Sequence, residues 1–125
     1  MAKGEHLSKS QLILADAIWA AGAFKVGSFR LKLHETDPEA PFSPFYISMR
    51  EKNVKEGQYP MLQKATANAL YIDTLPLVAE RNIDYVVGIP NAGTPLAEAY
   101  AVLSDIPQLK MTKVETSAGR FYHLL

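Results

Sequence analysis

Apolar positions in the first part of the chain predict a helix followed by short strands. From residue 8 or 10 to residue 21, apolar side chains recur every three or four positions, which places them on one helical face. Gly22 follows as a typical helix stop. In residues 24–33, apolar and polar residues alternate on both sides of Gly27-Ser28, so we expect two short strands around a turn. Aromatic and β-branched residues predict a further strand at 45–49.

The second half of the chain predicts helices that alternate with strands. Residues 59–80 have helical spacing, and Pro76 is expected to end or kink this helix. The run 84–89 is almost wholly apolar, as in a strand that is buried on both faces of a parallel sheet. Thr94 is expected to cap the next helix, and residues 109–114 are a candidate for a further strand.

This order of elements predicts an α/β fold in a single domain of residues 1–125. Residues 1–58 would hold the first helix and a small β part, and residues 59–125 a core with a short parallel sheet flanked by helices. So small a sheet is expected to expose an edge and part of one face, and such surfaces favour association. The apolar tail, residues 121–125, is expected to dock on this subunit or on a partner.

Charge and composition exclude several classes of protein. The 13 Lys and Arg residues balance the 13 Asp and Glu residues, which argues against a nucleic-acid partner bound through its phosphates. Because the chain has no Cys, it has no disulfide, thiolate zinc site or Cys nucleophile. Its three His residues form no ligand pair, so no metal site is expected. A polar start and the lack of a long apolar run predict a cytoplasmic protein without a membrane partner.

The junction at residues 86–95 is the best candidate for chemistry. It is a predicted strand, a loop with two glycines and a helix start, and ligands of parallel sheets bind beyond the carboxyl ends of the strands. Free amides and the positive end of the helix dipole suit a phosphate or a carboxylate. The loop matches neither the P-loop nor the GxGxxG pattern, and an ordinary strand-to-helix turn is the alternative.

Three segments resemble the N-terminal half of the orotate phosphoribosyltransferases, which are type I phosphoribosyltransferases of pyrimidine biosynthesis. They follow the family's order at roughly its spacing. Residues 22–32, GAFKVGSFRLK, are similar to G-x-F-K-F-G-x-F-x-L-K; residues 43–50, SPFYISMR, to S-P-x-Y-x-D-x-R; and residues 87–97, VGIPNAGTPLA, to G-V-P-x-x-G-x-P-L-A. The resemblance implies a truncated type I phosphoribosyltransferase-like fold. It also implies a reaction in which orotate and phosphoribosyl pyrophosphate give orotidine 5′-phosphate and pyrophosphate.

The resemblance assigns roles to matching residues. Lys32 would reach the ligands of the site, and Phe45 and Tyr46 would contact the orotate ring. From the residues alone, a solvated lysine and core packing are the alternatives. The third segment would approach pyrophosphate or the base through Asn91, Ala92, Gly93 and Thr94, and Gly93 permits a close approach because it lacks a Cβ. Lys113 would contact pyrophosphate.

The chain also departs from the family's pattern. Residues 33–42 form an acidic insertion with prolines after Lys32, which would displace this lysine or cover it. Of the family's loop R-K-x-x-K-x-x-G, only Lys113 and Gly119 match, and Thr116 replaces the second lysine. The family's pair of adjacent acids, which holds the ribose of phosphoribosyl pyrophosphate, has no counterpart, because no two acidic residues are adjacent here. We expect no catalytic residue and no built-in cofactor, with Mg²⁺ bound only if phosphoribosyl pyrophosphate is.

Three functional hypotheses follow from these matches and departures. The first is an orotate phosphoribosyltransferase-like protein that binds orotate or a related pyrimidine but is inactive alone. The second is a half-enzyme completed by another chain, and the third is a non-enzymatic interaction or regulatory domain on the same scaffold. Because the family is dimeric and a sheet edge is expected to be exposed, we also predict a homodimer.

Overall fold

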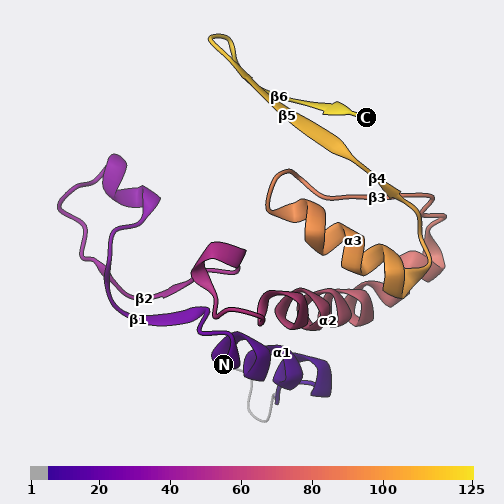
Figure 1. The fold of residues 1–125 in the computed structure, drawn as a ribbon, viewed down its shortest axis with the longest axis horizontal. Helices are drawn as coiled ribbons and strands as arrows, with labels where there is room; N and C mark the ends of the chain where they lie inside the picture. The colour runs from indigo at the N-terminus through magenta and orange to yellow at the C-terminus, as the bar shows by residue number, and fades with distance from the viewer. Residues whose placement is uncertain (1–5) are drawn as a thin grey trace. The chain divides into compact units, whose positions relative to one another are not determined.

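The computed structural model describes residues 6–125 and has an α/β fold (Figure 1). Two short 3₁₀ turns, Lys32–Glu35 and Glu51–Asn53, lie between its main elements. In chain order these elements are α1 (Lys9–Ala20), β1 (Phe24–Phe29), β2 (Ser43–Ile47), α2 (Tyr59–Glu80), β3 (Val86–Val87), α3 (Gly93–Ser104), β4 (Gln108–Leu109), β5 (Met111–Thr116) and β6 (Gly119–Leu124).

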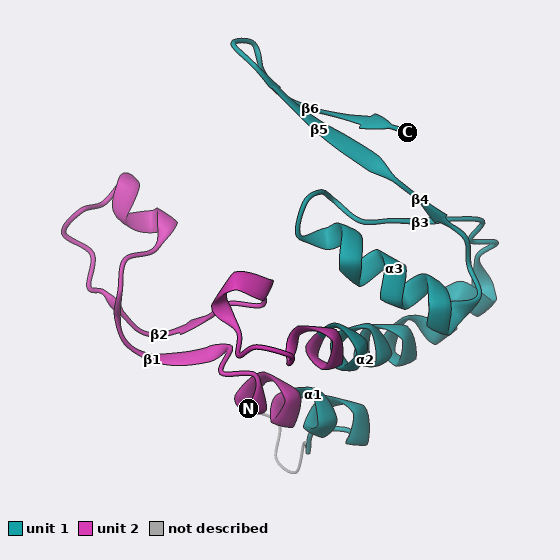
Figure 2. Cartoon of the chain, viewed as in Figure 1, with its two compact units in different colours: residues 1–14, 63–125 teal, residues 15–62 magenta. Residues whose placement is uncertain are grey.

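The chain divides into two compact units (Figure 2). The smaller unit is residues 15–62, and the larger one combines residues 63–125 with the described residues up to 14, so the division passes through α1 and α2. The sequence predicted a division of one domain near residues 58 and 59, and the number of domains stays a prediction. None of the helices within residues 6–125 is long and apolar enough to cross a membrane.

The smaller unit is built on an antiparallel ribbon of β1 and β2 (Figure 1). Phe24 pairs with Ile47 and Val26 with Phe45, and the register shifts after Val26. The prediction of a turn at Gly27-Ser28 is wrong, because these two residues lie inside β1, where the strand is irregular, and form no hairpin. The strand that pairs with β1 comes after the 33–42 insertion, and local alternation gives no information on that pairing. At one end of the ribbon, Ala21, Ala23 and the fully buried Leu62 form the core of this unit.

The larger unit contains the parallel sheet that the sequence predicted. β3 pairs in parallel with β4, and α3 connects the two strands. Its core consists of Ala67 from α2, Tyr100 from α3 and Ile106 from the turn before β4. The expectation of a strand at 84–89 buried on both faces is wrong: β3 has two residues, and Val87 is exposed. A strand with one neighbour leaves a sheet edge uncovered, as the sequence predicted.

Helix α2 runs through Pro76 without ending there, whereas the sequence predicted that the helix ends or is kinked at this residue. A proline inside a helix removes one backbone hydrogen bond and crowds the preceding turn. Tyr71 and Val78 lie on either side of Pro76, and both pack against the core of the larger unit. This packing on both sides holds the helix together, so tertiary contacts outweigh the local preference.

The C-terminal residues form a hairpin, whereas only one strand, at 109–114, was predicted there. Lys110 interrupts that strand, and β5 continues and pairs antiparallel with β6 along its whole length. Ser117 and Ala118 make the turn, and Gly119 follows with a φ of 132°, which favours glycine. The apolar tail therefore pairs with β5, while the side chains of β6 stay exposed.

Candidate functional site

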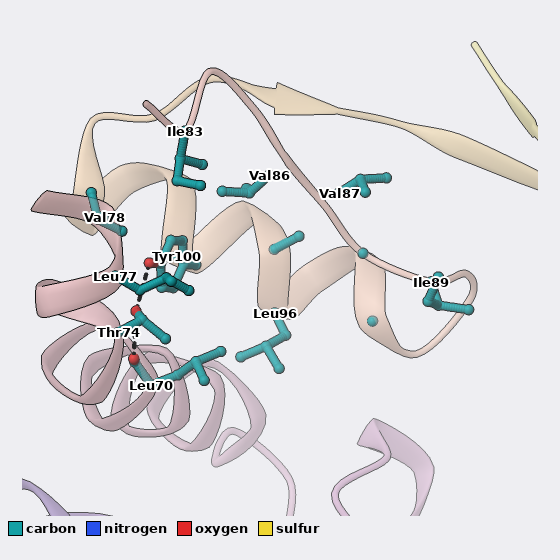
Figure 3. Close-up of a pocket in the computed structure, with 13 residues that line it drawn as sticks. Leu70, Thr74, Leu77, Val78, Ile83, Val86, Val87, Ile89, Leu96 and Tyr100 are labelled. Carbon is teal, nitrogen blue, oxygen red and sulfur yellow. Dashed lines mark hydrogen bonds between the residues drawn. The ribbon is translucent and has the colours of Figure 1, made fainter. Parts of the chain in front are cut away.

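An open apolar groove lies in the larger unit, between α2, β3 and α3 (Figure 3). Its volume is about 480 Å³, and nearly all of its lining is aliphatic or aromatic. Val86 and Val87 come from β3, and Leu96 comes from α3 (Figure 3). The other lining residues are Leu70, Thr74, Leu77, Val78, Ile83, Gly88, Ile89, Gly93, Ala97 and Tyr100.

A short chain of hydrogen bonds crosses one side of this groove (Figure 3). The Thr74 hydroxyl donates to the Leu70 carbonyl at 2.8 Å and lies 2.7 Å from the Tyr100 hydroxyl. Because Thr74 has a single hydroxyl proton, Tyr100 is the donor between the two hydroxyls. The buried Tyr100 hydroxyl is therefore satisfied inside the protein, and the groove offers a ligand mainly apolar contact.

At one end of the groove, the loop after β3 comes into close backbone contact with the start of α3. A Cβ on Gly88 would overlap the Gly93 carbonyl and lie 2.9 Å from the Thr94 nitrogen. A Cβ on Gly93 would meet only ordinary contacts, the nearest at 3.4 Å from the Gly88 carbonyl carbon. The residue that permits the close approach within this protein is therefore Gly88, which sequence reasoning did not single out.

The backbone amides of this loop are partly used by the loop itself. The amide of Gly93 donates to the Ile89 carbonyl at 2.9 Å, and that of Thr94 donates to the Asn91 carbonyl at 3.4 Å. Within residues 6–125, the amides of Asn91 and Ala92 donate to no backbone carbonyl outside the regular elements. Of the four predicted contacts, Asn91 and Ala92 therefore retain the best donors for an anion.

The expected cap of α3 differs from the observed one. The helix begins at Gly93, its N-cap is Ala92, and no side chain bonds to the cap. Thr94 lies inside the first turn, and its carbonyl accepts a hydrogen bond from the Gln108 side chain at 3.2 Å. The Thr94 cap prediction is therefore wrong, and the helix starts two residues earlier than predicted.

In the smaller unit, Phe45 and Tyr46 point to opposite faces of the β1–β2 ribbon. Adjacent residues of a strand alternate in direction, and each of these two has its own aromatic neighbour. Phe45 stacks on Phe24 with ring centroids 5.7 Å apart, and Tyr46 lies 5.7 Å from Phe29. The two predicted ring contacts therefore lie on separate surfaces, and a planar ligand stacked on one face meets only one of them.

Lys25 lies beside Tyr46 and was not predicted as a site residue. The two are directly opposite in the ribbon register, and so they share a face with Phe29. This face therefore combines the rings of Phe29 and Tyr46, the second of which is a phenol, with the ammonium group of Lys25. Lys25 was not predicted because its place beside Tyr46 depends on the pairing of β1 with β2. In the sequence alone, Lys25 is only a polar position in an alternating strand.

Lys32 is exposed at the base of the insertion, in a polar hollow of about 560 Å³. Arg30, His34 and Glu35 are among the residues that line the same hollow. The insertion closes on the buried His34: Nδ1 lies 2.8 Å from the Leu31 amide, which donates to it, and Nε2 lies 3.0 Å from the Ala40 carbonyl. With Nδ1 as acceptor, Nε2 carries the proton and donates. The insertion therefore follows Lys32 as a loop held by hydrogen bonds of His34.

Lys113 lies in an exposed charge cluster of the β5–β6 hairpin. Its Nζ is 3.7 Å from a Glu115 carboxylate oxygen, and the Arg120 guanidinium binds the same oxygen at 2.9 Å. A hydrogen bond with Tyr122, followed by one with Glu115, raises the pKa of Arg120. Arg120 is thus a second cation near Lys113. Sequence reasoning missed it because the hairpin was not predicted.

The candidate residues form two groups, one in each unit. The smaller unit holds Lys32, Phe45 and Tyr46, and the larger unit holds Lys113 and residues 91–94. Within residues 6–125, no three His, Asp or Glu side chains gather where they could hold a metal ion. The described residues therefore do not fit a Mg²⁺ ion held by side chains of this protein alone.

The contact at Gly88 predicts a difference between two glycine variants. Gly88→Ala is expected to lower the free energy of unfolding by about 1–3 kcal/mol or more, because backbone atoms must shift to admit the methyl group. Gly93→Ala, the matched control, is expected to be neutral or slightly stabilising, because the added Cβ makes only ordinary contacts and the position is helical. Urea unfolding of both variants tests this. Equal stabilities would contradict the close approach at Gly88.

The similarity of this chain to known proteins is one of fold. No protein-family model matches the chain, and no curated protein matches it. Among solved structures, a UMP synthase of Leishmania donovani is similar, with 24% sequence identity and a TM-score of 0.57. The match covers 88% of this chain but 21% of the UMP synthase chain. The α/β fold described above is therefore similar to part of a UMP synthase.

Proposed function

We propose that this chain is an orotate phosphoribosyltransferase-like protein that binds orotate or a related pyrimidine. The observation that carries the proposal is the segment 87–97, which resembles the family and forms a strand, a loop and a helix start with donors at Asn91 and Ala92. The fold is similar to part of a UMP synthase, an enzyme named for a pyrimidine nucleotide. This similarity supports a relation to the enzymes of pyrimidine biosynthesis.

We propose that the pyrimidine ring stacks on the ribbon face that carries Tyr46. Orotate is a planar ring with a carboxylate, and this face pairs the rings of Tyr46 and Phe29 with the ammonium group of Lys25. Aromatic stacking together with a charged hydrogen bond suits such a ligand. Lys32, which the resemblance places at the ligands of the site, is a second candidate for the carboxylate, and Arg30 lines the same hollow as another cation. Lys25 and Lys32 are therefore alternatives that one experiment can separate.

Pyrophosphate is proposed to bind in the larger unit. The amides of Asn91 and Ala92 provide neutral donors near a helix N-terminus, and Lys113 and Arg120 provide charge. Glu115 partly neutralises both cations, so it weakens the attraction for an anion. An anionic ligand would compete with this carboxylate for the two cations.

Turnover by this chain alone is not proposed. The reaction forms a bond from the pyrimidine nitrogen to the ribose carbon while the bond to pyrophosphate breaks, and the family holds the ribose through adjacent acids that this sequence lacks. A half-enzyme completed by another chain is the second candidate. The open apolar groove beside β3 favours it, because a further chain would cover exposed Val87 and Ile89 there.

Calorimetric titration with orotate tests the pyrimidine site. Loss of the lysine that meets the carboxylate is expected to weaken binding about tenfold or more, because a charged hydrogen bond is removed. The variants are Lys25→Ala and Lys32→Ala, with the exposed Lys52→Ala as a control in the same unit. Uracil, which lacks the carboxylate, should bind the native chain and the affected variant equally weakly. A flat titration up to millimolar orotate would contradict the proposed function.

Titration with pyrophosphate at low ionic strength tests the hairpin cations. Glu115→Gln is expected to tighten binding about two- to fivefold, and Arg120→Ala to weaken it by a similar factor, as for exposed charges. Glu98→Gln is the control, because this exposed carboxylate lies 4.0 Å from the Lys110 ammonium and not in the cluster. If Glu115→Gln and Glu98→Gln change the affinity equally, the effect is net charge alone, and the cluster has no specific role.

A further inference from the structure

The insertion between β1 and β2 is built around one buried side chain, the imidazole of His34 (Figure 1). His34 is 2% exposed, whereas Ala40 is half-buried and the other residues from 33 to 42 are exposed. A loop without an apolar core depends on hydrogen bonds to stay closed, because closure costs backbone entropy. The imidazole joins the two ends of this loop, with Leu31 on one side and Ala40 on the other.

One of these contacts is a helix cap that a proton can remove. His34 is the third residue after Leu31, which is the N-cap of the 3₁₀ turn, and its Nδ1 accepts the Leu31 amide at 2.8 Å. In a capping box this position holds Glu or Gln, whose side-chain oxygen accepts at neutral pH. An imidazole nitrogen accepts only while it is unprotonated. The cap of this turn is therefore titratable.

Protonation of His34 changes the contact at Leu31 but not the one at Ala40. Nε2 donates to the Ala40 carbonyl in both states, at 3.0 Å. A proton on Nδ1 can turn to the Leu31 carbonyl, 3.2 Å away, but the Leu31 amide then faces a second donor and loses its acceptor. This cap is therefore present above the range in which imidazoles titrate, roughly pH 5–8, and is lost as the pH falls through it.

The surroundings of His34 offer little to a charged ring. The ionisable groups nearest to it along the chain are two cations and three acids: Arg30, Lys32, Glu35, Asp37 and Glu39. Arg30, Lys32 and Glu35 line the same hollow as His34, and Asp37 and Glu39 are exposed. Within residues 6–125, no carboxylate forms an ion pair with His34. A protonated His34 is therefore a buried cation without a paired charge, which is unfavourable.

A second cation already lies beside the aromatic neighbour of His34. The Phe42 ring meets the imidazole edge to face, with centroids 5.2 Å apart. The Arg30 guanidinium lies over the same Phe42 ring, 5.8 Å from its centroid. A protonated imidazole would bring a like charge to this ring, and repulsion from Arg30 would add to the cost.

We propose that the insertion, residues 33–42, is a pH-dependent flap that is closed while His34 is neutral and opens when His34 is protonated. Opening changes the hollow that Arg30, Lys32 and Glu35 line. The pairing of β1 with β2 from Phe24 to Val26 lies outside the insertion, so the ribbon is kept. The flap lies where this chain departs from the family that it resembles, so the switch is a property of this chain.

Hydrogen exchange of the full chain, followed by NMR at pH 8 and pH 5, tests the flap. After correction for the intrinsic exchange rates, protection of the Leu31 amide is expected to fall about tenfold or more at pH 5, because its acceptor is lost. Amides of α2 should keep their protection at both pH values. Imidazole nitrogen signals should show the His34 proton on Nε2 at pH 8.

Two Asn variants separate His34 from the other imidazoles. His34→Asn offers a neutral oxygen that does not titrate, so the dependence on pH should vanish whether the loop of this variant is closed or open. His123→Asn makes the same change at an exposed residue of β6 and should keep the native response.

Four results would overturn the proposal. They are unchanged protection of Leu31 in the native chain, a pH response that persists in His34→Asn, a His34 proton on Nδ1 at pH 8, and a loss of protection that extends to α2, which would show general unfolding. None of these results depends on pyrimidine binding.

Discussion

The pairing of β1 with β2 is the constraint on which the smaller unit depends. The two strands are separated along the chain by the ordered insertion that closes on His34, and their register sets the direction of every side chain on the ribbon. A shift by one residue would exchange the two faces. With the observed register, Tyr46 and Lys25 share one face, and Phe45 stacks on Phe24 on the other. The two rings that the resemblance assigns to the ligand therefore lie on separate surfaces of one small element.

In the larger unit, a backbone contact has the corresponding role. Gly88 touches the carbonyl of Gly93, so the chain turns from β3 into α3 with little room for a side chain. This turn uses the amides of Gly93 and Thr94 internally and leaves those of Asn91 and Ala92 as donors. The local folding of the loop therefore selects which part of the family-like segment is available to an anion. The hairpin adds Lys113 and Arg120, with Glu115 between them as an internal competitor.

Helices and strands that follow from a local pattern of apolar residues were predictable from the sequence. Features that depend on contacts between distant residues were not. The helix expected at 59–80 matches α2, and the parallel pairing of β3 with β4 is confirmed. Gly27-Ser28 resembles a turn locally, but the partner of β1 lies beyond the insertion, so the prediction of a turn failed. Pro76 was expected to end or kink this helix, and α2 does not end there, because packing on both sides of the proline outweighs the local preference. Of the candidate site, the segments were predictable, whereas Lys25, Gly88 and Arg120 emerged only once strand pairing and backbone contacts were known.

Side-chain NMR of labelled Phe and Tyr rings, recorded while orotate is added, tests whether the pyrimidine stacks on the side of the ribbon that carries Tyr46. If it does, orotate shifts the ring signals of Tyr46 and leaves those of Phe45 unchanged, because the two rings lie on opposite sides. Orotate shifts at Phe45 with none at Tyr46, or no shift at either ring, would show that the ligand does not bind there.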